Sequence, residues 1–287
     1  MTRILGISRH PRFSPNSEER DAAIFAKVCE KLVAHSVEVM TYPEAEVRTF
    51  SPQDWAAVQP DVVFSMARFD VVLCQLEVLS QQSIPVLNQP TALRTASRES
   101  FYHTLHQAGL PWVETHLLRP ATDCFPPCDF PLWLKRNDAR SEVAGDVAFV
   151  TDADTYLAAM SDFLQRGIDE VVATPHVEGD LIKFYGVKGT DFFYYYYPTA
   201  ENDFSKFGLE RHNGSPQGFP LNEPYFKSIA DQTAHLTGLT IYGGDAVLTE
   251  QGEIYLIDFN DFPSFSRCRD AAASAIAECV LNEIRRE

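Results

Sequence analysis

The chain of 287 residues lacks the features that mark membrane and secreted proteins. No apolar stretch reaches the roughly 20 residues that a membrane-spanning helix needs. Residues 1–6 show neither the long apolar run nor the small-residue cleavage site of a signal peptide, and they suit a first buried strand. We therefore expect a cytoplasmic protein with no membrane partner.

Basic side chains are also scarce. The 24 lysines and arginines stand against 40 aspartates and glutamates, which gives a formal net charge of -16. Such a surface repels phosphate backbones, so we expect no nucleic-acid partner. The acidity does not exclude a small phosphorylated ligand, because a few lysines and metal ions can dominate the potential inside a cleft.

Cysteine is present but without metal-site spacing. The six cysteines are scattered, and Cys124 and Cys128 have no second pair or histidine pair to complete a zinc site. Reduced, mostly buried thiols are the better interpretation.

Residues 1–90 alternate strand and helix signals. Short apolar runs predict strands at residues 4–8, 37–40, 62–66 and 85–87. Between them, Asn16 with Glu19 suits the start of a helix, and residues 71–79 suit a second one. This rhythm predicts a doubly wound, Rossmann-like parallel sheet whose ligands approach the carboxyl ends of the strands.

The rest of the chain mixes strands and helices into two α+β lobes. Gly109 and Pro111 end a predicted helix over residues 97–108, and a proline-rich linker follows an extended segment at 114–118. Further strands are predicted at 132–135, 147–150, 171–174, 181–187, 192–197, 241–248 and 254–259, and further helices at 154–164, 225–237 and 270–285. We predict an N-terminal domain over residues 1–90, a central lobe over 91–187 and a C-terminal lobe over 188–287.

The strongest chemical signal lies near the C-terminus. Asp258 and Asn260 are two apart on a predicted strand, so their side chains share a face, and Asp245 on the preceding strand can reach the same face. Two carboxylates and an amide oxygen suit a partly hydrated Mg²⁺ that bridges nucleotide phosphates. The alternative is that the aspartates only cap turns, but a carboxylate inside an apolar strand without a partner is costly.

Two other segments supply candidate ligand contacts. Lys135 ends an apolar strand, and the polar loop that follows contains the small residue Ser141, so both could meet phosphates. Residues 171–185 run from a buried strand through a hinge into acidic residues and then Lys183. A nucleotide slot needs backbone groups for the base, a carboxylate for the ribose and a cation for the phosphates. A plain turn with exposed charges would explain the same residues.

Together, and in this order, these segments resemble the ATP-grasp superfamily over nearly the whole chain. The resemblance implies ATP between two α+β lobes, with adenine against Thr174, Pro175, His176 and Val177. It implies Lys135 and Lys183 on the phosphates, either Glu178 or Asp180 on the ribose, and Asp245, Asp258 and Asn260 on Mg²⁺, with Mn²⁺ as an alternative.

The resemblance also points to residues near the transferred phosphate and the substrate. Arg211 lies where such enzymes place an arginine against that phosphate, beside Lys183 as a second catalytic cation; an exposed loop arginine is the alternative. The candidate substrate contacts are Arg9, His10 and Arg12 after the first strand, and Ser266 and Arg267 after the metal motif. Ser264 stands where the family commonly has glycine, which makes the substrate end unusual.

The implied activity is that of an ATP-dependent ligase. It would convert a small-molecule carboxylate into an acylphosphate that an amine or thiol then attacks. One alternative is a kinase acting on a hydroxylated metabolite such as an inositol phosphate, because residues 181–185 are similar to a strand of the ATP-grasp inositol polyphosphate kinases. Another is a non-catalytic nucleotide-binding protein. The sequence leaves a homodimer open.

Overall fold

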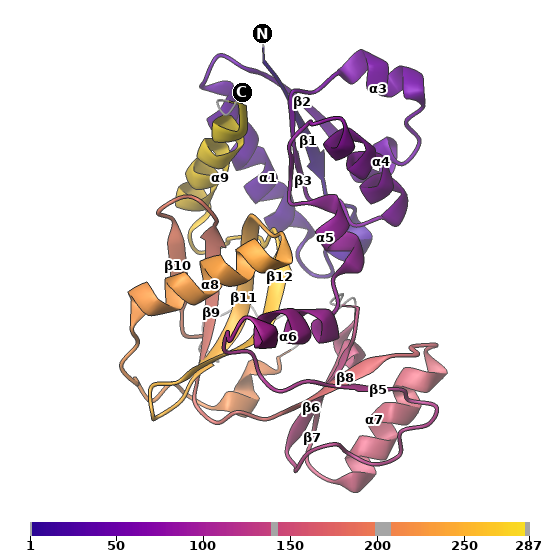
Figure 1. Ribbon diagram of the computed structural model, residues 1–287, viewed down its shortest axis with the longest axis vertical. Coiled ribbons are helices and arrows are strands. Elements are labelled where there is room, and N and C mark those ends of the chain that lie inside the picture. Colours follow the sequence, from indigo (N-terminus) through magenta and orange to yellow (C-terminus); the bar gives the residue numbers. More distant parts are fainter. Residues whose placement is uncertain (1, 139–142, 199–207, 285–287) are drawn as a thin grey trace.

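The computed structural model describes residues 2–138, 143–198 and 208–284. Within these ranges the strands form three four-stranded sheets, in the orders β2-β1-β3-β4, β5-β8-β6-β7 and β10-β9-β11-β12 (Figure 1). No helix in the same ranges is long and apolar enough to cross a membrane. The mixture of one parallel and two antiparallel sheets agrees with the predicted α/β and α+β class.

The N-terminal sheet is parallel, as the βαβ rhythm predicts. It consists of β1 (Arg3–Ser8), β2 (Glu38–Pro43), β3 (Val62–Ser65) and β4 (Val86–Leu87). Its helices are α1 (Glu18–Val33), α2 (Glu44–Val47), α3 (Pro52–Val58), α4 (Asp70–Gln81) and α5 (Pro90–Thr95), of which α2, α3 and α5 were not predicted. The carboxyl ends of β1 and β3 lead into loops that line the cavity described below.

Helix α1 forms because its apolar residues recur at helical spacing, and Ile24, Val28 and Leu32 are buried. The predicted cap is wrong by one position. Ser17 is the N-cap residue, whereas Asn16 lies in the preceding turn with a φ of 59°. Asparagine tolerates this left-handed conformation better than most residues, so Asn16 serves the turn rather than the helix end.

The central sheet is antiparallel and contains β5 (His116–Leu118), β6 (Leu132–Arg136), β7 (Val147–Val150) and β8 (Val171–Pro175). Helix α7 (Ala153–Gln165) covers it with Tyr156, Met160 and Phe163, which are buried. The Tyr156 hydroxyl donates to the carbonyl oxygens of Asp123 and Phe125, which fastens the proline-rich linker to this lobe. Val147 follows a short 3-10 helix, η2 (Ala144–Asp146).

The C-terminal sheet is also antiparallel and contains β9 (Asp180–Val187), β10 (Phe193–Tyr196), β11 (Ile241–Leu248) and β12 (Ile254–Asp261). One face packs against α6 (Arg98–Gln107) and α8 (Glu223–Thr237), in a core that includes Phe184, Phe226 and Tyr242. Because side chains alternate along a strand, the residues between these core positions face the other way, toward the central lobe.

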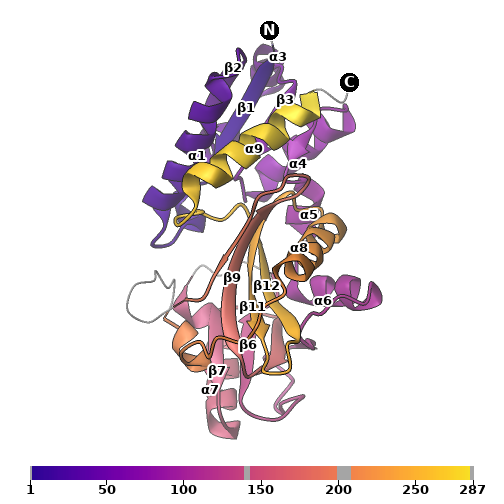
Figure 2. The ribbon, with the colours of Figure 1, turned by 90° about the vertical axis from the view of Figure 1, so that its left-hand side faces the viewer.

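The structure differs from the predicted division of the chain in two places. Strand β9, which we placed in the central lobe, pairs with β10 and β11 of the C-terminal sheet, so the boundary at residue 187 falls inside that sheet. The last helix, α9 (Arg269–Ile284), lies beside α1 and joins the N-terminal core through Ile276 and Val280 (Figure 2). The β9–β11 pairing and the packing of α9 on α1 join segments that are far apart in the chain, and no local pattern specifies them.

Candidate functional site

A cavity of about 550 Å³ opens between the C-terminal sheet, the central sheet and the end of the N-terminal sheet. Its floor is the face of β9, β11 and β12 that is turned away from α6 and α8. The wall also includes Trp133 and Lys135 of β6, Thr174 of β8, and Arg9 and Arg68 from the loops after β1 and β3. All three sheets therefore contribute to one site.

Strand register sorts the cavity floor into three chemically different rows. An apolar row contains Leu181 and its register partner Val247; Ile257, which the bulge in the β11–β12 pairing leaves without a register partner, also lines the cavity. A charged row crosses the whole sheet through Tyr196, Lys183, Asp245 and Asp258. A third row, which we call the glycine row, contains Tyr185, Gly243 and Asn260. Residues two apart on a strand share a face, so the rows succeed one another from the central lobe toward the N-terminal domain.

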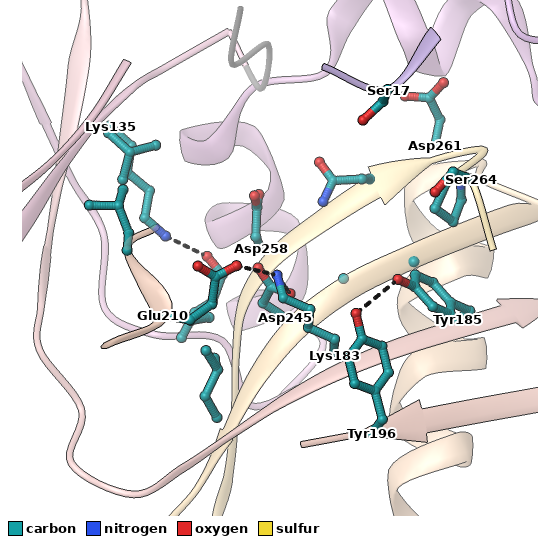
Figure 3. Close-up of a pocket in the computed structure, with 18 of the residues that line it drawn as sticks. Ser17, Lys135, Lys183, Tyr185, Tyr196, Glu210, Asp245, Asp258, Asp261 and Ser264 are labelled. Carbon is teal, nitrogen blue, oxygen red and sulfur yellow. Dashed lines mark hydrogen bonds and ion pairs between the residues drawn. The ribbon is translucent and has the colours of Figure 1, made fainter. Parts of the chain in front are cut away.

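Lys183 lies at the centre of the charged row (Figure 3). Its Nζ is 3.3 Å from Asp245 Oδ1 and 3.2 Å from Glu210 Oε1. Burial works to lower the pKa of Lys183, but the carboxylates of Asp245 and Glu210 outweigh it and raise the pKa above its ordinary value. Lys183 therefore remains a cation across the physiological range and suits contact with a phosphate.

Asp245 and Asp258 are direct partners in the β11–β12 pairing. Burial raises the pKa of Asp245; Lys183 opposes this effect, while Asp258 and Glu210 add to it. Two carboxylates held close together repel each other unless a cation is present. With Asn260 from the glycine row they offer oxygen ligands only, which fits Mg²⁺ better than a softer metal.

Arg98, at the start of α6, holds Asp258 from the other side. Its Nη2 is 3.4 Å from Asp258 Oδ2, and its Nη1 donates to the carbonyl oxygen of Arg136 at 2.7 Å. Burial works to raise the pKa of Asp258, but Arg98 and Lys135 outweigh it and lower the pKa. The sequence predicts the helix but not this contact, because Arg98 and Asp258 are 160 residues apart.

Lys135 reaches the same cavity from β6. It is 7% exposed, and its Nζ donates to the carbonyl oxygen of Ile257 at 2.9 Å. Burial lowers its pKa to about 8, which Arg98 reinforces and Asp258 and Asp245 oppose. The structure thus brings Lys135, Lys183 and the metal-ligand candidates to one cavity, in the arrangement that the sequence predicts.

The predicted hinge lies at the apolar row. Thr174, Pro175, His176 and Val177 all line the cavity. His176 Nδ1 accepts a hydrogen bond from Trp133 Nε1 at 3.1 Å, and burial lowers the pKa of His176, which favours the neutral ring. Aromatic and aliphatic walls with backbone groups at the edge are suited to a flat heterocyclic base.

Neither predicted ribose carboxylate faces the cavity. Glu178 is exposed and lies outside the cavity wall. Asp180 is 1% exposed, and its carboxylate accepts hydrogen bonds from the backbone N–H groups of Gln217, Gly218 and Phe219 at 2.5 to 3.0 Å. Asp180 therefore organises that turn. Glu210 and Asn213, from the 3-10 helix η3 (Glu210–Asn213), line the cavity instead.

Arg211 is also misplaced by the prediction. It is exposed on η3 and lies outside the cavity wall, while its neighbour Glu210 points to Lys183. A one-residue shift along a 3-10 helix rotates a side chain by about 120°. Ser141, the candidate phosphate contact of the polar loop, lies outside the described residues.

Of the three candidates in the basic loop after β1, only Arg9 lines the cavity. Its guanidinium group is buried, with Nη1 3.0 Å from Asp21 Oδ2 and Nη2 2.9 Å from the carbonyl oxygen of Phe262. His10 instead packs on Phe69, with ring centroids 5.0 Å apart, and lies outside the cavity wall. Arg12 is exposed and lies outside it too. The predictions for His10 and Arg12 are therefore wrong.

The substrate candidates after β12 do reach the cavity. Ser266 Oγ lies 2.9 Å from Ser264 Oγ, and the Arg267 guanidinium lies 4.3 Å from the ring centroid of Tyr196. Other cavity residues escape sequence reasoning because no motif marks them: Arg20, Arg68, Tyr185, Tyr196 and Glu210.

The residues present fit a hydrated divalent cation. Within the described ranges no group of three or more histidine, cysteine, aspartate or glutamate side chains forms a metal cluster. The predicted set has two carboxylates and an amide, and the cation would take its remaining ligands from water and phosphates.

A parallel N-terminal sheet, followed by two antiparallel sheets that enclose a cavity lined with lysines and carboxylates, defines the ATP-grasp fold. Solved structures of this fold match the chain along its full length. No protein-family model matches the sequence, and no curated protein matches it either.

The matching structures include D-alanyl-alanine synthetase A from Vibrio cholerae, with a TM-score of 0.70, 15% identity, and coverage of 100% of this chain and 99% of that one. A D-alanine–D-alanine ligase from Bacillus anthracis gives a TM-score of 0.67 at 15% identity, covering 100% and 98%. A RimK domain ATP-grasp protein from Sphaerobacter thermophilus gives 0.67 at 17% identity, covering 98% and 100%. At these identities the likeness establishes the fold alone.

Proposed function

We propose that this protein is an ATP-dependent ligase that activates a small-molecule carboxylate and transfers its acyl group to an amine or thiol. The observation that carries the proposal is the meeting of Lys135, Lys183, Asp245, Asp258 and Asn260 at one cavity beside an apolar slot. The likeness to solved structures of a ligase, a synthetase and a complex of that ligase with ATP supports it.

In this proposal each of the three rows contacts a different part of Mg–ATP or its substrate. The apolar row, Trp133 and the hinge hold the base of ATP, and Lys135 and Lys183 bind its phosphates. Asp245, Asp258 and Asn260 would hold Mg²⁺, or Mn²⁺, which supplies positive charge to the β- and γ-phosphates. Arg98 keeps the Asp258 carboxylate ionised and oriented toward the cavity.

The reaction needs positioning and charge neutralisation more than a dedicated acid or base. A carboxylate oxygen of the substrate bonds to the γ-phosphorus as the bond from that phosphorus to ADP breaks. The amine or thiol then attacks the acyl carbon, and inorganic phosphate leaves with the electrons of the acyl C–O bond. Lys183 would offset charge on the transferred phosphoryl group in the first step.

A kinase for a hydroxylated, phosphorylated metabolite is the second candidate. An anionic kinase substrate would meet the arginines Arg9, Arg20, Arg68 and Arg267 on the cavity wall beyond the glycine row. Such a wall also suits an anionic acid, so these residues do not discriminate between a kinase and a ligase.

Product stoichiometry discriminates between the candidates. The purified protein is incubated with Mg–ATP and pools of metabolites, and ADP and inorganic phosphate are measured together. A ligase releases both in equal amounts, and only when a carboxylate and a nucleophile are present. A kinase releases ADP and keeps the phosphate on its product. Tight binding of Mg–ATP without ADP formation in any pool would support a non-catalytic nucleotide-binding protein instead.

We further propose a cytoplasmic location with a small-molecule substrate and no nucleic-acid or membrane partner. The net charge of -16 supports the exclusion of nucleic acid. Fractionation of cells that express the tagged full-length chain tests the location.

A further inference from the structure

The cavity continues past the glycine row toward the N-terminal domain. We call this part the acceptor end, because it lies on the far side of the charged row from the hinge. It is lined by Ser17, Arg20, Arg68, Tyr185, Ser264 and Arg267. Figure 3 shows Ser17, Asp261 and Ser264 gathered beyond Asp258 and Tyr185.

The carboxylates at the acceptor end are already committed to protein partners. Asp21 accepts hydrogen bonds from Arg9 at 3.0 Å and from the Ser14 hydroxyl at 2.7 Å. Asp261 pairs with Arg9 at 3.4 Å and with Arg68. Their side chains are only 7% and 6% exposed. A ligand ammonium group would have to break one of these buried ion pairs, which is costly.

The same wall is rich in hydrogen-bond donors. Among the described residues, four arginines and two aspartates line this end: Arg9, Arg20, Arg68, Arg267, Asp21 and Asp261. The excess of positive charge stands out in a chain whose net charge is -16. The Arg267 guanidinium group lies over the Tyr196 ring, 4.3 Å from its centroid. The planar guanidinium group matches the paired oxygens of a carboxylate or phosphate. The serine hydroxyls add neutral donors beside it.

The strip between the charged row and the arginines is apolar and flat. A Cβ at Gly243 would lie 2.8 Å from Tyr185 Cδ1 and 2.9 Å from Pro263 Cγ, so the two rings occupy the space beside this backbone. A ligand body would therefore lie against the Tyr185 and Pro263 rings, both of which line the cavity. The rows are about 7 Å apart along a strand, which leaves space for a short carbon chain or ring.

From these observations we propose that the acceptor acid is at least a dianion: besides the reacting carboxylate it carries a second carboxylate or a phosphate at Arg267 and Arg20, and no ammonium group at this end. This inference rests on the proposed ligase function and specifies its substrate class. The reacting carboxylate lies next to the charged row, and the second anionic group lies past the Tyr185–Pro263 strip.

Matched acids test the substrate class. With a pool of amines and thiols present throughout, ADP release is measured with dicarboxylic acids of four to six carbons, phosphorylated carboxylic acids, the monoamides of the same dicarboxylic acids, and α-amino acids of equal length. We expect kcat/KM for a dianionic acid to exceed that for its monoamide at least ~10-fold, the size of one charge-assisted hydrogen bond. A preference for monoamides or amino acids would overturn the inference while leaving the ligase function intact.

A variant locates the second anionic group. Arg267→Gln should raise KM for the dianionic acid about 10-fold, leave KM for ATP unchanged, and have little effect with the monoamide. Arg20→Gln should act in the same direction. Arg12→Gln, which changes an exposed arginine outside the cavity, is the matched control and should change neither KM. Equal loss with acid and monoamide would contradict the assignment.

The two proposals fail in different ways. If none of the acids releases ADP although the protein binds Mg–ATP in calorimetry, the ligase function itself fails and the inference fails with it. If a monoanionic acid gives ADP and phosphate in equal amounts and no dianion does better, only the substrate class is wrong.

Discussion

The sequence predicts ligand contacts both on the floor of the cavity and in the loop after β1. Only on the floor do all the predicted side chains lie at the cavity. Lys183, Asp245, Asp258 and Asn260 all face the cavity. In the loop, Arg9 reaches the cavity wall, whereas His10 and Arg12 lie outside it. Strand geometry fixes the direction of every second side chain, so one correct placement determines its neighbours. A loop has no such rule.

The comparison also separates two uses of charge. On the floor, opposite and like charges crowd together, and the pKa of Lys183 and that of Asp245 are both raised. At the loop, Arg9 is matched by Asp21 and Asp261 in a closed network. Ionisable groups with strongly shifted pKa values are typical of ligand sites. Oppositely charged groups that pair with one another are typical of contacts that hold the fold together. Mutations at the two regions should therefore have different effects.

The largest effect should come from the floor. Asp258→Asn keeps the size of the side chain and its contact with the Phe259 N–H group but removes the charge that a metal needs. We expect ADP formation to fall by about 10²-fold or more in a variant that still folds, as judged by circular dichroism. Glu178→Gln, on an exposed residue outside the cavity, is the control. Retention of wild-type turnover in Asp258→Asn would remove the metal assignment.

The loop should respond in stability instead. Arg9→Gln leaves the buried carboxylates of Asp21 and Asp261 with one fewer cation, and we expect a loss of about 3 kcal/mol in the free energy of unfolding. Urea denaturation followed by circular dichroism measures it. Arg12→Gln should stay within about 0.5 kcal/mol of the wild type. A similar loss in both variants would mean that the loop acts through its exposed charges.

Sequence reasoning predicted the elements and the main motif because both are local. Apolar periodicity placed most strands and the longer helices, and the two-residue spacing of Asp258 and Asn260 gave their common face. Sheet membership of β9 and the packing of α9 on α1 depend on partners far along the chain. Short elements such as α2 and α5 are too brief to show a period.

The errors within the site have the same origin. Asp180 has the residue type and position expected of a ribose ligand, but the turn at residues 217–219 uses its oxygens. Nothing near Asp180 in the sequence indicates that turn. Arg98 is the reverse case: it contacts Asp258 across 160 residues, and its own surroundings suggest only a helix start. Neither contact could be predicted without the tertiary structure.

A smaller effect is expected at Lys135, whose pKa of about 8 makes its charge sensitive to pH. Lys135→Ala should weaken Mg–ATP binding about 10-fold in calorimetry, the loss of one charge-assisted contact. In the wild type the lysine is protonated below pH 8 and loses its charge above it, so affinity should fall as the pH rises past 8.

Lys135→Arg provides the matched control, because an arginine stays charged throughout this range. Its ATP affinity should be flat between pH 7 and about 9, apart from changes shared with the wild type. An equally steep fall in Lys135→Arg would assign the pH dependence to another group.

The smallest effect is expected at Glu210. Its carboxylate lies 3.2 Å from Lys183 Nζ, so it is a direct partner of the lysine that we assign to the phosphates. If Glu210 only stands in for the phosphate, Glu210→Gln removes a competitor and should tighten Mg–ATP binding about 3- to 5-fold, within the range of a partly exposed ion pair.

The opposite sign would give Glu210 a different role. Glu178 and Asp180 leave the ribose without its predicted carboxylate, and Glu210 is the acidic residue of η3 that lines the cavity. Weaker binding of ATP in Glu210→Gln, with unchanged binding of an ATP analogue that lacks the ribose hydroxyls, would assign Glu210 to those hydroxyls. If both nucleotides bind more tightly by the same factor, Glu210 acts through Lys183 instead. The two nucleotides carry the same triphosphate and differ only in the ribose hydroxyls.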